Sequence, residues 1–164
     1  DSRFLTGLVQ LIKHRDVIYK MLYIYIKSLL SNKGEKRIHN IQKNLMRLGV
    51  SISSSMLSSQ AFIYSATIAI CSSVHTNIWM KEKITSFSTY AVLGLKVYGI
   101  VEQASRSANH LKNYNAYYYN LLYQEELEMM FFLIEPIIMR SPILNQAYAS
   151  DSDIAYAISR MIKG

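Results

Sequence analysis

Residues 48–80 read LGVSISSSMLSSQAFIYSATIAICSSVHTNIWM and contain no Asp, Glu, Lys or Arg. The most apolar part is residues 61–71, which include the only cysteine, Cys71. A helix without a charged face must be covered by other protein or by lipid. The stretch is therefore either a buried central helix of a bundle or an element that inserts into a membrane, and the sequence leaves both readings open.

A second segment of low charge follows the first. The charged residues Lys81, Glu82 and Lys83 separate residues 48–80 from residues 84–101, where Lys96 is the only charge. Small residues at every fourth position, Ala61, Ser65 and Ala69, favour close helix contacts. Together the two segments predict a hydrophobic helical hairpin over residues 48–101.

This pattern resembles the hydrophobic hairpin of pore-forming colicin-type toxins in its architecture, over about a third of the chain. In that family, amphipathic helices shelter the hairpin and open on a membrane. The resemblance implies a membrane-active, toxin-like bundle.

The flanking segments predict an all-α fold. Apolar residues at helical spacing predict one amphipathic helix over residues 4–30 and another over residues 35–48. Ser150 and Asp153 form a capping-box pattern at the start of the last helix. Pro136 should end the helix before it, and Ser141 with Pro142 should begin a short helix to residue 149. No segment alternates with a period of two, so we expect a bundle of about five to seven helices around a central hydrophobic helix or hairpin.

Composition supports a single all-helical domain over residues 1–164. The chain has only two prolines and six glycines, which is typical of long helices with few loops. One cysteine excludes an internal disulfide and gives no indication of location. The chain begins with Asp1 and shows no targeting segment, so we interpret it as a processed protein or as a fragment of a longer chain.

A net charge of +7 predicts an anionic partner. The most basic stretch surrounds the helix at residues 35–48, where Glu35 is the only acid. Clustered cations of this kind bind phosphates without sequence specificity. The predicted anion-binding or phosphate-binding residues are Lys36, Arg37, Lys43 and Arg47.

One group of residues has a catalytic appearance. Glu102, Arg106 and His110 lie four residues apart and would share one helix face. His could act as acid or base while Arg stabilises a charged transition state. The spacing resembles that of helical HEPN ribonucleases, although three residues here separate Arg from His, where that class has four to six. These residues are candidates if the protein cleaves RNA.

The segment 113–123 is rich in tyrosine. Tyrosines are favoured at protein interfaces, and their rings can also stack on unpaired bases. We predict an interaction surface that includes Tyr114, Tyr117 and Tyr118.

The sequence predicts neither a metal nor a cofactor. It has no Gly-rich phosphate loop and no nucleophile elbow, and its four histidines have no diagnostic metal spacing. The leading hypothesis is a non-enzymatic, membrane-active bundle with a sheltered hairpin at residues 48–101. The alternatives are a basic RNA-binding or RNA-cleaving module and a protein-interaction module, such as an inhibitor or adaptor. The expected partner is correspondingly an anionic membrane, RNA or an acidic protein.

Overall fold

The computed structural model describes residues 2–13, 16–75, 82, 85, 98–143 and 145–164. These residues contain nine helices and no strand, which confirms the all-α prediction and exceeds the expected five to seven helices. In chain order the elements are α1 (Ser2–Lys13), α2 (Val17–Leu30), α3 (Glu35–Arg47), α4 (Ser59–His75), α6 (Tyr98–Tyr114), α7 (Ala116–Gln124), the 3₁₀ helix η1 (Glu128–Leu133), α8 (Glu135–Ile138) and α9 (Asp151–Lys163).

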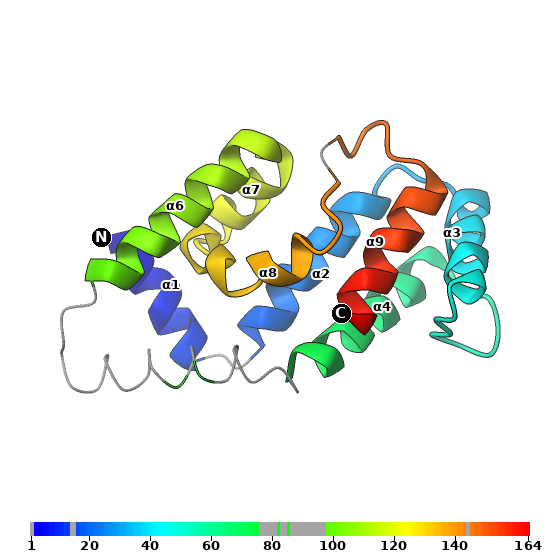
Figure 1. The fold of residues 1–164 in the computed structure, drawn as a ribbon, viewed down its shortest axis with the longest axis horizontal. Coiled ribbons are helices and arrows are strands. Elements are labelled where there is room, and N and C mark those ends of the chain that lie inside the picture. Colours follow the sequence, from blue (N-terminus) through cyan, green and yellow to red (C-terminus); the bar gives the residue numbers. More distant parts are fainter. Residues whose placement is uncertain (1, 14–15, 76–81, 83–84, 86–97, 144) are drawn as a thin grey trace.

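The helices form two groups that share one hydrophobic core (Figure 1). In the first group, α6 packs on α7 and η1, and α1 also packs on η1. In the second group, α4 packs on α2 and α9, and α9 also packs on α3. Contacts of α2 with α7, and of α8 with both η1 and α9, join the two groups.

The apolar helix α4 is covered on one side. Phe62, Ala66 and Ile70 are fully buried at successive four-residue steps, as expected for a helix that packs on α2 and α9. Tyr64 and Ile68 on other sides of the helix are 55% and 43% exposed. Cys71, in the most apolar part of the sequence, is buried.

The charge-free stretch is not helical throughout. Residues 48–58 form an irregular segment before α4, which we call the serine loop. Gln42 of α3 holds this loop, because its side-chain amide donates to the Leu57 carbonyl and accepts from the Leu57 N–H, each at 2.9 Å. The Ser59 N–H and hydroxyl donate to Glu35 at 3.2 and 3.0 Å. Serine side chains compete for backbone hydrogen bonds, which explains why helix formation begins only after this serine-rich segment.

The second arm of the predicted hairpin lies mostly outside the described residues. Its last residues, 98–101, form the first turn of α6. The hairpin as a unit therefore stays a prediction.

Two further helix predictions were wrong. The helix expected over residues 4–30 is two helices, with α1 ending at Lys13 and α2 beginning after Asp16, where a polar run interrupts the apolar spacing. The short helix expected after Pro142 is absent among the described residues 141–143 and 145–149. There the Asn145 side chain accepts from the Ala147 N–H at 3.2 Å, and this local hydrogen bond favours a turn over a helix.

The other boundaries agree with the sequence. Pro136 lies in the first turn of α8 and follows the end of η1. Ser150 and Asp153 form the predicted capping box of α9. Ile154, Ala157, Ile158 and Met161 of that helix are buried.

Candidate functional site

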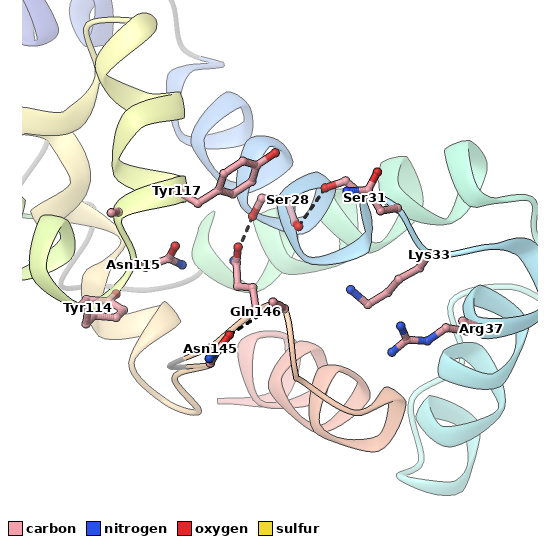
Figure 2. Close-up of a pocket in the computed structure, with 12 residues that line it drawn as sticks. Ser28, Ser31, Lys33, Arg37, Tyr114, Asn115, Tyr117, Asn145 and Gln146 are labelled. Atoms are coloured by element: carbon pink, nitrogen blue, oxygen red, sulfur yellow. Dashed lines mark hydrogen bonds between the residues drawn. The ribbon is translucent and has the colours of Figure 1, made fainter.

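A cleft of about 620 Å³ lies where the two helix groups meet (Figure 2). Its walls are the end of α2, the α2–α3 turn, the first turn of α3, the junction of α6 with α7, and the turn at residues 145–147. The described residues that line it are Ser28, Ser31, Asn32, Lys33, Arg37, Tyr114, Asn115, Ala116, Tyr117, Asn145, Gln146 and Ala147, and none of these carries a carboxylate.

Two cations form one side of this cleft. The Lys33 ammonium donates to the Leu29 carbonyl at 2.6 Å. Burial and the nearby Arg37 guanidinium lower the pKa of Lys33, while Asp151 opposes this shift. Arg37 donates through Nε to Asp151 at 2.9 Å, which ties the start of α3 to the start of α9.

Asn115 forms the opposite side, between α6 and α7. Its Oδ1 accepts from the Tyr118 N–H at 3.1 Å and so caps α7. This hydrogen bond fixes the orientation of the amide, because only the oxygen can accept. The residue is 7% exposed, and its Nδ2 has no hydrogen-bond partner. Figure 2 shows the amide directed from the start of α7 toward the cleft.

A second hollow, of about 560 Å³, adjoins the first along α3. It is lined by Lys36, Arg37, His39, Asn40, Lys43 and Asp151, so Arg37 lines both hollows. The structure thus brings three of the four predicted anion-binding residues together. Arg47 lies further along α3 and is exposed.

The end of α3 combines positive charge with exposed apolar side chains. Lys43, Met46 and Arg47 are neighbours on one helix face by their spacing, and all three are exposed. Met46 is 51% exposed, and Leu48 and Met56 of the serine loop are 37% and 38% exposed. Met46 and Met56 also line one hollow of about 170 Å³. We call these five residues the α3–loop surface.

The predicted catalytic residues Glu102, Arg106 and His110 all lie on α6 and are exposed. Nδ1 of His110 is 3.3 Å from a carboxylate oxygen of Glu135 in α8. The His110 ring also packs against Tyr114, with ring centroids 5.0 Å apart. The ion-pair partner of His110 among the described residues is thus Glu135 and not Glu102, and a catalytic role of Glu102, Arg106 and His110 stays a prediction.

The tyrosine segment divides between surface and core. Tyr117 is 55% exposed, whereas Tyr114 is half-buried. Tyr118 is fully buried, donates to the Met21 carbonyl at 2.8 Å and packs edge-on against Tyr25. The prediction of Tyr118 as a surface residue was therefore wrong, because successive helical residues point in different directions.

Sequence reasoning missed Lys33 and Asn115 as site residues. A signal for Asn115 is present, because Asn between two helical segments favours an N-cap, and a capping Asn still carries an unused amide donor. The cleft itself depends on residues 28–37, 114–117 and 145–147 meeting in space, which local patterns do not indicate.

The described residues contain no group of three metal-ligating side chains and no helix long and apolar enough to cross a membrane. Burial raises the pKa of the Cys71 thiol to about 11, so this side chain is not an activated nucleophile. The chain matches no protein-family model, no curated protein and no solved structure.

Proposed function

We propose that this protein is a non-enzymatic helical bundle that acts at an anionic membrane surface. The observation that carries the proposal is the α3–loop surface, where Lys43 and Arg47 lie beside the exposed Met46, Leu48 and Met56. No acidic residue occurs in the sequence between Glu35 and Glu82.

This combination suits a lipid surface. Each Lys or Arg near an anionic bilayer contributes about 1 kcal/mol of attraction. Exposed apolar side chains beside the cations can enter the boundary between headgroups and acyl chains. Water-exposed methionine and leucine side chains would lose their unfavourable hydration at this position.

The more specific part of the proposal is that the protein permeabilises the membrane after it binds. The apolar helix α4 is covered by protein on one side, whereas its Tyr64 and Ile68 side chains are exposed. In this proposal, α4 leaves α2 and α9 when the α3–loop surface has bound, and residues 48–101 enter the bilayer.

Vesicle binding and dye release test the two parts separately. We expect binding to vesicles rich in phosphatidylserine and little binding to phosphatidylcholine vesicles. The double variant Lys43→Gln/Arg47→Gln should bind roughly 30-fold more weakly, from about 2 kcal/mol of lost attraction. A matched control, Lys13→Gln/Lys112→Gln, removes the same charge from the exposed lysines of α1 and α6.

Equal weakening in both double variants would show that net charge alone drives binding and would reject the α3–loop surface. Binding without dye release at neutral and acid pH would keep the surface association and reject insertion of residues 48–101. Equal binding to neutral vesicles would contradict the electrostatic argument.

A further inference from the structure

We infer that the cleft at the start of α7 binds a phosphate ester of a small molecule that carries a flat ring, of which a mononucleotide is the simplest type. This inference does not depend on membrane association, because the cleft lies between the two helix groups and shares no residue with the α3–loop surface.

The amide of Asn115 has an unpaired donor in the cleft wall. Burying a polar N–H without a partner costs about 1–3 kcal/mol. Asn115 is only 7% exposed, and its Nδ2 has no hydrogen-bond partner. A ligand oxygen in the cleft would satisfy this donor. Capping of α7 explains the Asn115 oxygen but leaves the nitrogen unexplained.

Asn115 is also the N-cap of a helix, α7. The nine-residue α7 begins in the cleft wall with Ala116 and Tyr117. The first N–H groups of a helix have no intrahelical acceptor, and the helix dipole favours an anion at this end. Asn115 Nδ2 and this helix end therefore favour the same kind of ligand atom, an anionic oxygen.

The charge of the cleft wall also favours an anion. Lys33 lines it and has a backbone carbonyl, not a carboxylate, as its hydrogen-bond acceptor. Arg37 also lines it, although Asp151 accepts its Nε–H at 2.9 Å. With no carboxylate among the described lining residues, a dianionic phosphate would meet a net positive wall.

The volume of the cleft and an aromatic side chain at its edge favour a phosphate ester over inorganic phosphate. The cleft volume of about 620 Å³ lies within the range of roughly 300–1,000 Å³ typical of small-molecule sites. Tyr117 lines the same cleft with a 55% exposed ring. An exposed tyrosine ring offers a face on which a nucleobase or similar ring can stack.

The test is calorimetric titration of the full chain with inorganic phosphate and with adenosine monophosphate. We expect both to bind, the nucleotide more tightly. The variant Asn115→Asp should weaken both at least tenfold, because Asp still caps α7 but replaces the amide donor with a negative charge. The matched control Asn120→Asp makes the same change at an exposed position of the same helix, outside the cleft, and should stay within twofold of the wild type.

A further variant, Tyr117→Ala, separates the ring from the phosphate. It should weaken the nucleotide at least fivefold and leave inorganic phosphate unchanged. Thermal unfolding of each variant, followed by circular dichroism, confirms that the fold is retained.

Three results would overturn the inference. These are no binding of either compound, equal weakening by Asn115→Asp and Asn120→Asp, or no effect of Tyr117→Ala on the nucleotide. Vesicles that contain phosphatidic acid identify the source of the phosphate. Binding that depends on Asn115 with these vesicles, but with neither free compound, would assign the site to a lipid headgroup and reject the soluble ester.

Discussion

The two helix groups use their charged side chains in different ways. In the first group, Arg3 of α1 contacts both carboxylate oxygens of the buried Glu128 in η1. In the second group, Lys36, Lys43 and Arg47 of α3 are exposed to solvent, and Lys36 and Lys43 line an open hollow. Arg3 thus holds helices of the first group together, as Arg37 holds α3 to α9, whereas Lys36, Lys43 and Arg47 of α3 are available to a partner.

A second contrast appears between the two ends of helix α7. The Arg3 guanidinium also donates to the Tyr123 carbonyl at 2.9 Å near the end of α7 and lies over the Tyr123 ring, 3.8 Å from its centroid. At the other end of α7, by contrast, Asn115 leaves a donor unused in the cleft that Lys33 and Arg37 also line. One end of this helix is thus closed by protein, and the other opens on the cleft.

The largest expected effect concerns the closed end. Replacing Arg3 with Met removes the partner of Glu128, whose side chain is only 3% exposed. Breaking a buried ion pair from one side costs about 3–5 kcal/mol, because a charge stays buried without compensation. Since Arg3 itself is partly exposed, we expect the lower end, about 3 kcal/mol in the free energy of unfolding measured by urea denaturation.

An exposed ion pair of the same chain provides the control. Lys20 and Glu125 are 2.7 Å apart, with side chains 43% and 46% exposed. Lys20→Met should cost at most about 1 kcal/mol. The double variant Arg3→Met/Glu128→Gln should recover part of the stability lost in Arg3→Met. Equal losses for Arg3→Met and Lys20→Met would show that burial of Glu128 does not matter and would remove the contrast between the groups.

A smaller effect is expected from two adjacent tyrosines of α7. Tyr118→Phe removes the buried hydroxyl that donates to the Met21 carbonyl, and should lower the free energy of unfolding by about 1 kcal/mol. Tyr117→Phe, on the exposed side, should change it by less than about 0.5 kcal/mol. Similar losses at the two positions, measured by the same urea titration, would contradict the division of this helix between core and cleft.

The sequence predicted the helices better than their grouping. Periodic apolar residues correctly identified α3, and the capping box correctly identified the start of α9. Both features are local, since a stripe or a cap is complete within a few residues. The irregular structure of the serine loop was not predicted from local patterns, because the contacts that hold the loop come from Gln42 and Glu35 in another helix.

The candidate site was less predictable for a related reason. The cations of α3 are visible as a cluster in the sequence, and the structure places Lys36, Arg37 and Lys43 around one hollow. Arg37 nevertheless has a partner, Asp151, that lies more than a hundred residues away in the chain. Tyr118 and Tyr117 are chemically identical, and the packing of α7 on α2, α6 and η1 determines which of them is buried.

The smallest effect is expected at the histidine whose spacing suggested catalysis. Because the His110 side chain is 54% exposed, its pairing with Glu135 should contribute only a few tenths of a kcal/mol, and His110→Ala should change the unfolding free energy by about that amount. If α6 has this structural role alone, RNA incubated with the wild type or the variant should stay intact in a gel-based assay. Cleavage by the wild type that His110→Ala abolishes would instead make His110 a catalytic residue. Charged side chains of the first helix group would then act on a substrate as well as hold helices together. The contrast with the exposed cations of α3 would no longer hold.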